Sequence, residues 1–430
     1  MIKRNTPQHI TAIVTALMLV AAVAPAQHVL ADNIDTEALQ PALRDFADRL
    51  PHVRAQTPDV TAAADASALR ILENPQALFH VPYTELTGLG DELTNRAGGL
   101  ANALPLASRR RHTTDNDVVL LSVRAWDTDG DVMLEKLADY RERGWMVTLI
   151  ASEQGRPEDL DVDFFIDNGA PSGDSEHGRV NVLVNTALAW MWCCEYVSAM
   201  TREGKLPGIL ISIGIPGGIA HDRPIQTREG RLETSDTDVA IPEGELALMY
   251  VGRLHRLVAD LASPWRQSQI ETAADIAADY LNRGQNVIVS GVGHLITGEQ
   301  DKEYHSPFHG RHHGHVRRGR LESDFNEGDL LIWIGYSGGL NSAHHDFAKH
   351  ITAAQLDVIT CYTPDPRFDE PDLGEIDEPL AHIDQSWSIG DTEVRMAVTP
   401  GHMAPISGIN GVLILRMLDD EVAQRITASE

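Results

Sequence analysis

Two turns rich in Gly and Ser carry the groups best suited to binding a ligand. Ser290-Gly-Val-Gly-His294 follows an apolar run at 286–290, and Gly335-Tyr-Ser-Gly-Gly-Leu-Asn-Ser342 follows another at 330–334. Glycines let a ligand approach the main chain, and the N–H groups of a following helix can bind an anion. A plain tight turn explains the first motif equally well. If both turns lie at the carboxyl edge of a sheet, where α/β proteins bind ligands, the contacting residues are Ser290, Gly291, Gly293, Ser337, Gly338, Gly339, Asn341 and Ser342.

The second turn also spells G-x-S-x-G, the nucleophile turn of serine hydrolases. Ser337, a later acid (Asp384 or Asp391) and then His402 follow the hydrolase order Ser, Asp, His. We rank this alternative second, because it leaves the repeated pattern described below unexplained.

A histidine-rich segment is the most unusual stretch of the chain. Five histidines lie between His305 and His315, followed by the basic run Arg317-Arg-Gly-Arg320. Histidine clusters can bind Zn²⁺, but this one has no clear ligand spacing and its arginines oppose a cation. We therefore assign neither a metal nor another cofactor.

The apolar runs predict alternating strands and helices in two similar halves. Runs that are apolar on both faces suit the interior of a parallel sheet covered by helices. The order Asp, strand, loop, helix and strand occurs in both halves, which predicts two doubly wound α/β units. We expect strands at 117–123, 145–151, 164–166, 208–213, 286–290, 330–334 and 356–361, and helices at 181–200, 245–261, 267–282 and 342–354.

Composition limits the class of protein. The formal net charge is −28, which argues against binding to nucleic acid or to anionic lipid. Three cysteines (Cys193, Cys194 and Cys361) are too few for a disulfide scaffold, and we expect buried thiols.

The first residues resemble a secretory signal peptide. Lys3 and Arg4 precede an apolar stretch from Ile10 to Ala24 and small-residue processing sites up to Ala31. We expect removal of residues 1–31, a periplasmic or secreted protein, and no membrane association afterwards.

Several motifs resemble the sugar isomerase (SIS) family. The second half carries Val-Ile-Val-Ser-Gly-Val-Gly-His at 287–294, Gly-Asp-Leu-Leu-Ile-Trp-Ile-Gly-Tyr-Ser-Gly-Gly-Leu-Asn at 328–341, and Pro-Ile-Ser-Gly-Ile-Asn-Gly-Val at 405–412. The first half carries Gly-Asp-Glu-Leu-Thr-Asn-Arg-Ala-Gly-Gly at 90–99 and Ile-Asp-Asn-Gly-Ala-Pro-Ser-Gly-Asp at 166–174. The resemblance implies flavodoxin-like, three-layer αβα domains with parallel sheets. We place a degenerate first domain at 32–216, a linker at 217–243 and a second domain at 244–430.

The resemblance also implies a ligand and a reaction. SIS proteins bind or isomerise sugars and sugar phosphates, with active sites across domain pairs, so we expect a sugar ligand between the halves. Where the family has a Gly/Ser phosphate loop, the first half has residues 122–129, which lack a suitable glycine and contain two aspartates.

Aldose–ketose isomerisation needs a base that moves a proton between C1 and C2, and a carboxylate suits this step. The candidates are Glu299 and Glu92. Of these, Glu92 matches the carboxylate of the Glu-Leu-Thr-x-Arg helix in SIS isomerases of the heptose-phosphate type. That subfamily has a metal-binding His four residues earlier, where this chain has Gly88. His294 is a candidate for ring opening.

Structural roles are alternatives for these residues: either glutamate can lie on a solvated helix face, and His294 can cap a helix. The whole chain can also be a non-catalytic sugar sensor. A homodimer is a further option.

Overall fold

The computed structural model describes residues 36–82, 89–105, 113–172, 178–212, 217–225, 232–291, 309–310, 328–335, 355–363, 378–387, 391–396, 398 and 402–427. The expected signal peptide at 1–31, the expected helix at 342–354 and nearly all of the histidine-rich segment lie outside these residues.

Two five-stranded parallel sheets form the framework. The first has the order β2-β1-β3-β4-β5, and the second has the order β12-β11-β10-β8-β9. Numbered along the chain within each sheet, both orders read 2-1-3-4-5, the flavodoxin-like order. The strands are β1 (Phe79–His80), β2 (Ala103–Leu104), β3 (Val118–Ser122), β4 (Met146–Ala151), β5 (Phe164–Asp167), β8 (Val287–Gly291), β9 (His309–Gly310), β10 (Leu330–Ile334), β11 (Asp357–Tyr362) and β12 (Ala381–Asp384). The predicted parallel-sheet α/β class is confirmed.

An aspartate before the third strand organises the amino edge of both sheets. Asp117 accepts a hydrogen bond from the main-chain N–H of Leu78, at 3.0 Å. Asp329 accepts one from the main-chain N–H of Asn286, at 3.1 Å. Both aspartates are buried, so their hydrogen bonds hold the start of the first strand against the third. The repeated Asp read from the sequence is therefore a structural device.

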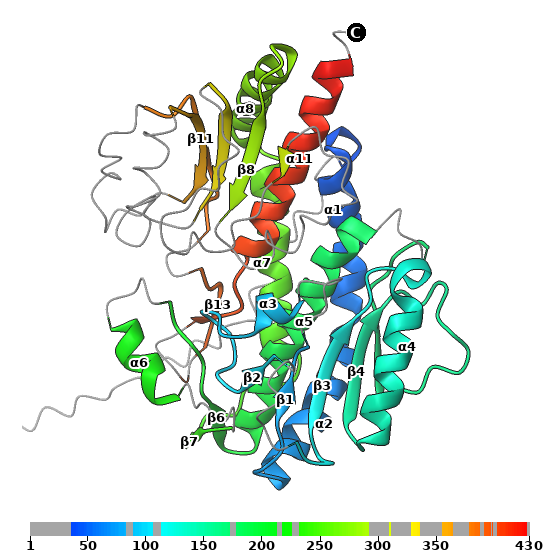
Figure 1. Ribbon diagram of the computed structural model, residues 1–430. Helices are drawn as coiled ribbons and strands as arrows, with labels where there is room; N and C mark the ends of the chain where they lie inside the picture. Colours follow the sequence, from blue (N-terminus) through cyan, green and yellow to red (C-terminus); the bar gives the residue numbers. More distant parts are fainter. Residues whose placement is uncertain are drawn as a thin grey trace, which may run out of the picture.

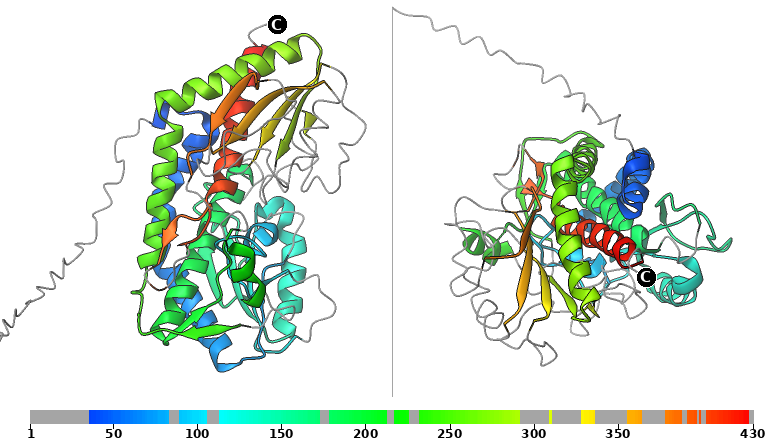
Figure 2. Two further views of the ribbon diagram at one scale, coloured as in Figure 1. Left: turned by 90° about the vertical axis from the view of Figure 1, so that its left-hand side faces the viewer. Right: turned by 90° about the horizontal axis from the view of Figure 1, so that it is seen from above.

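Helices lie between the two sheets, which Figure 1 shows at opposite ends of the molecule. Among them are α1 (Pro41–Ala55), α5 (Gly178–Arg202), α7 (Glu245–Leu261) and α11 (Ser407–Thr427). The long helix α5 packs on α2 (Thr57–Glu73) and α7, and α11 packs on α8 (Pro264–Asn282) and α1. Figure 2 shows the same arrangement from the side and from above. The core therefore runs continuously from one sheet to the other.

Burial of apolar side chains explains why α5 and α7 form where the sequence predicted helices, whereas α1 was not predicted. Trp190, Trp192, Cys193 and Cys194 on α5 are at most 1 % exposed, and all three cysteines are free and buried, as expected. Helix α4 (Trp126–Glu142) covers the first sheet instead. No helix in the described part of the chain is long and apolar enough to cross a membrane.

One expectation for the middle of the chain is wrong. The strand expected at 208–213 is absent; β6 (Lys205–Pro207) instead pairs antiparallel with β7 (Thr234–Asp236). Ile209 and Leu210 are buried because they run beside 98–101, where Gly98 donates a main-chain hydrogen bond to Leu210 at 2.7 Å. The segment read as a linker or surface loop also contains α6 (Gly218–Ile225) and β7.

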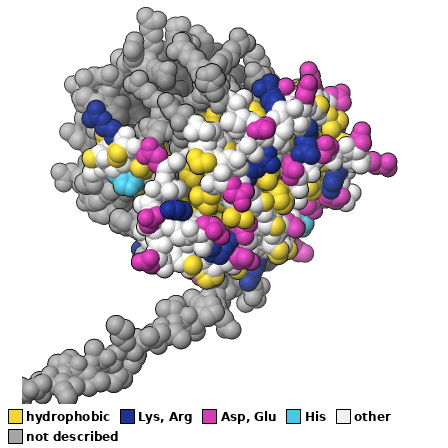
Figure 3. All heavy atoms as spheres, turned by 90° about the horizontal axis from the view of Figure 1, so that it is seen from below, with side chains coloured by type: hydrophobic (Ala, Val, Ile, Leu, Met, Phe, Trp, Pro, Cys, Tyr) yellow, Lys and Arg dark blue, Asp and Glu magenta, His cyan; other side chains and the backbone are white. Residues whose placement is uncertain are grey.

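The surface mixes charges. Figure 3 shows acidic, basic and apolar side chains interspersed on the described part of one face.

Candidate functional site

The two Gly/Ser turns leave the second sheet at the same edge. Strands β8 and β10 are parallel neighbours, with Gly291 opposite Ile334 and Ser290 opposite Trp333. Both turns therefore start at the carboxyl edge, beside each other. The candidates His294 and Glu299 lie outside the described residues. So do the remaining predicted ligand contacts, which are Gly293, Ser337, Gly338, Gly339, Asn341 and Ser342.

Buried amides tie the start of the second turn to helix α11. The side-chain amide of Gln385 donates to the carbonyl of Gly335 at 3.2 Å and to that of Cys361 at 3.1 Å. Asn410 on α11 donates to the carbonyl of Gln385 at 2.7 Å. The first turns of α11 are thereby held against the carboxyl edge of the second sheet.

Glu92 reaches the beginning of α11 from the first half of the chain. It lies on the short helix α3 (Leu89–Leu93) and is 0 % exposed. Its Oε1 is 3.2 Å from Nε of Arg96 and accepts a hydrogen bond from the indole of Trp190 at 3.3 Å. A Cβ on Gly408 would lie 2.9 Å from both carboxylate oxygens, so α11 comes this close only because residue 408 is glycine. The alternative of a solvated helix face for Glu92 is wrong.

Arg96 joins Glu92 to a second carboxylate. Its Nη2 donates to Oδ2 of Asp391 at 2.9 Å and to the hydroxyl of Ser407 at 2.8 Å. The main-chain N–H of Ser407 donates to Oδ1 of Asp391 at 2.9 Å. Residues 295 positions apart in the sequence thus meet at the start of α11. We call Glu92, Arg96, Asp391 and Ser407 the α11-start cluster.

The charge of this cluster is unequal, with two carboxylates for one guanidinium. Burial raises the pKa of Glu92 to about 7; the Asp391 charge adds to the effect, and Arg96 opposes it. Burial also raises the pKa of Asp391, again against the effect of Arg96. A carboxyl group that titrates near neutral pH can both take up and release a proton, which is what general acid–base catalysis requires.

The acids proposed for a serine hydrolase have other partners. Asp391 is engaged by Arg96 and Ser407, and Asp384 accepts the main-chain N–H of Ser386 at 2.8 Å. His402 places its Nδ1 3.3 Å from the carbonyl of Thr392. None of these contacts forms an acid–imidazole pair, so nothing in the described residues favours the hydrolase.

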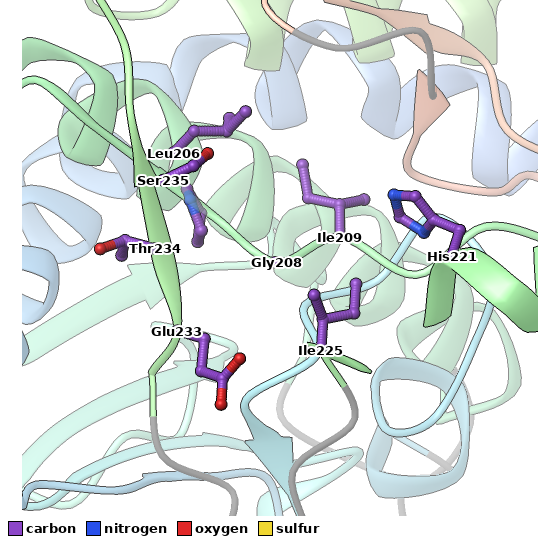
Figure 4. Close-up of a pocket in the computed structure, with 9 residues that line it drawn as sticks. Leu206, Gly208, Ile209, His221, Ile225, Glu233, Thr234 and Ser235 are labelled. Carbon is purple, nitrogen blue, oxygen red and sulfur yellow. The ribbon is translucent and has the colours of Figure 1, made fainter. Parts of the chain in front are cut away.

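A small hollow of 220 Å³ is lined by a different set of residues. Figure 4 shows it between β6, β7 and α6, with His221 and Glu233 among mainly apolar neighbours. Sequence reasoning assigned these residues no role. Within the described ranges, no three His, Cys, Asp or Glu side chains are grouped to hold a metal ion.

Neither a family model nor a curated protein matches this sequence. Solved structures do match its fold. The C-terminal domain of glucosamine-fructose-6-phosphate aminotransferase from Francisella tularensis superposes with a TM-score of 0.53 at 10 % identity, over 92 % of this chain and 98 % of that chain. The chain has a sugar isomerase fold. Tagatose-6-phosphate ketose/aldose isomerase from Escherichia coli gives a TM-score of 0.47 at 10 % identity, over 90 % of this chain and 91 % of that chain. The resemblance to the sugar isomerase family is confirmed at the level of the fold.

Proposed function

We propose that this chain binds a sugar or sugar phosphate at the carboxyl edge of the second sheet and interconverts its aldose and ketose forms. The observation that carries the proposal is the pairing of Gly291 with Ile334, which starts both Gly/Ser turns at one edge. The α11-start cluster, contributed by both halves, lies at the helix that packs against this edge. Such a site lies between the halves of the chain.

The turns supply hydroxyl and amide groups for the ligand, and a glutamate moves the proton. In this reaction the base takes a proton from C2 of the open-chain aldose and returns it to C1, while the hydroxyl proton on O2 moves to O1, so no external oxidant is needed. Glu92 suits the step because its pKa of about 7 lies near the working pH. Glu299 is the second candidate, because it follows the first turn. His294 remains the candidate for ring opening.

Proton exchange at C1 and C2 tests the reaction. We expect fructose 6-phosphate in D2O to exchange a C1 proton for deuterium, and the aldose formed from it to carry deuterium at C2, both followed by NMR. Glu92→Gln should lower kcat by about 100-fold or more, the usual contribution of a general base. Glu195→Gln is the matched control, since Glu195 is equally buried and has a raised pKa, caused mainly by burial. Its carboxylate binds the main-chain N–H groups of Gly244 and Ala247, so we expect this variant to lose stability while kcat stays within about twofold.

The alternatives give different results. Unchanged exchange in Glu92→Gln, with a loss in Glu299→Gln, moves the role to Glu299. Sugar-induced thermal stabilisation without exchange indicates a non-catalytic sensor. If a panel of sugars and sugar phosphates gives neither, with and without EDTA, the proposal fails.

We also propose two domains, 32–216 and 244–430, and export after removal of residues 1–31. The repeated strand order supports the first proposal, and the charge and apolar pattern of the first residues supports the second. Amino-terminal sequencing of the protein from a periplasmic fraction should begin at Asp32. Recovery of the intact chain from the cytoplasm would contradict export.

A further inference from the structure

We infer that the chain has one ligand site, at the second sheet, and that the equivalent edge of the first sheet is closed by the chain's own polar side chains. The inference rests on the proposed function for the second sheet. Its evidence comes from the first sheet, where the strand ends and their neighbours are described.

Strand pairing shows which positions correspond. Val118 opposite Phe79 corresponds to Leu330 opposite Val287, and Met146 opposite Val118 corresponds to Asp357 opposite Leu330. Counting along the sequence from Val118 and Leu330, Val123 corresponds to Gly335 and Asp129 to Asn341. The segment after β3 is thus the counterpart of the second Gly/Ser turn.

The Asp129 carboxylate fills the anion position of the first turn. Asp129 is 1 % exposed, and its Oδ2 accepts the main-chain N–H of Arg124 at 3.2 Å. The Arg124 guanidinium lies 3.7 Å from the other oxygen, which also accepts the hydroxyl of Thr128 at 2.9 Å. In an anion-binding turn, main-chain N–H and cationic groups face the ligand. Here they face a carboxylate of the chain itself.

Buried asparagines close the carbonyl side of the same edge. Asn185 donates to the carbonyl of Val123 at 2.9 Å, and Asn181 donates to that of Arg124 at 2.7 Å. Asn168 follows β5 and donates to Asn185 at 2.8 Å. All three asparagines are at most 2 % exposed. We call them the first-edge amides.

Asp167, the last residue of β5, accepts hydrogen bonds from two more main-chain N–H groups. Its Oδ1 accepts from the main chain of Glu153 at 2.9 Å and of Gly169 at 3.1 Å. Its Oδ2 lies 3.2 Å from Nε2 of His52. A phosphate at this edge would have to displace carboxylates from their donors and bind beside their charge.

At the second sheet, the sequence lacks the counterparts of two of these groups: the Asp129 carboxylate and the main-chain N–H of Glu153. Residues 335–342 contain no acid, and Asn341 is neutral where the first half has Asp129. Counting from Asp357, Pro364 corresponds to Glu153, and proline has no N–H to be bound. Asp384 corresponds to Asp167 and is kept. The two sheets therefore differ in the segments that follow their third and fourth strands, and not in the aspartate at the end of the fifth strand.

Calorimetric titration with fructose 6-phosphate tests the site count. We expect one site per chain in the wild type. Asn341→Asp should weaken binding by about tenfold or more, because a carboxylate there opposes the anionic ligand. Asp129→Asn should keep one site with an affinity within about twofold of wild type, because Asp167 still accepts the main-chain N–H groups of Glu153 and Gly169 at this edge. Two sites in either protein, or unchanged binding by Asn341→Asp, overturns the inference.

Hydrogen exchange decides the inference without any ligand. The amides of Arg124, Glu153 and Gly169 should exchange about tenfold or more slowly than in the unfolded chain, because carboxylates accept their hydrogens. Asp129→Asn should speed exchange at Arg124 and leave Glu153 unchanged. Exchange at unfolded-chain rates would show an open edge. A titration without heat, combined with protected amides, counts against fructose 6-phosphate as ligand and leaves the closed first edge standing.

Discussion

The first-edge amides and the α11-start cluster are both sets of buried polar side chains, but the first set is neutral and the second is charged. Asn168, Asn181 and Asn185 are neutral, and each side-chain amide can donate and accept at once. Glu92 and Asp391 share one arginine, and burial raises the pKa of Glu92 to about 7 against the effect of that arginine. The hydrogen bonds of the neutral amides do not depend on pH, whereas the Glu92 carboxyl in the charged cluster can gain or lose a proton near neutral pH.

Removing the arginine should break this comparison most strongly. Arg96→Met leaves two buried carboxyl groups without their cation, and we expect a loss of about 3–5 kcal/mol in the free energy of unfolding. Urea unfolding at pH 7 measures it. Arg143→Ala is the control, because its pair with Asp139 is about half exposed and is worth about 0.5 kcal/mol. A loss below about 1 kcal/mol in Arg96→Met would show that the cluster does not depend on its cation.

The pH dependence of stability should separate the two regions next. The pKa of Glu92 is raised from 4.5 to about 7 on folding, so the folded state holds this proton more tightly than the unfolded state. Its contribution is fully present below pH about 4.5 and is lost as the pH rises through about 7, a change of up to about 3 kcal/mol. Glu92→Gln should therefore match the wild type near pH 5 and exceed its stability near pH 8. Urea unfolding at both pH values checks this; parallel curves for the two proteins would contradict it.

The amide network should show the smallest effect. Asn185→Ala removes the bond to Val123 and leaves Asn168 without its acceptor, at a cost of about 1–2 kcal/mol. We expect the same loss at pH 5 and pH 8, since no charge is involved. Thermal unfolding at the two pH values gives the comparison, and a loss that varies with pH by more than about 0.5 kcal/mol would link the network to a titrating group.

The sequence predicted the strands that are buried on both faces and missed the shortest ones. Continuous apolar runs identified β3, β4, β10 and β11, because a central parallel strand has no solvated face. Strands β1, β2 and β9 have two residues each, too few for any pattern to be read. The run after Pro207 was equally apolar but packs beside residues 98–101. Local hydrophobicity indicates burial and does not identify the partner.

The candidate site was predicted in part. Family resemblance singled out Glu92, and the helix expected at 181–200 supplies Trp190, which is buried against it. No local signal connects Glu92 to Asp391 or Ser407, because these residues meet only once α3 and α11 have packed together. The raised pKa of Glu92 follows from that packing and could not be read from the motif alone.

Helix α5 has a consequence for biosynthesis. It packs on α2, which precedes it in the chain, and on α7, which ends at Leu261. While the chain emerges from the ribosome, the face of α5 that will meet α7 stays uncovered until Leu261 is out. An apolar surface exposed during synthesis favours aggregation and chaperone capture. A nascent chain stalled before α7 should therefore be held by chaperones, and one stalled well beyond it should be released.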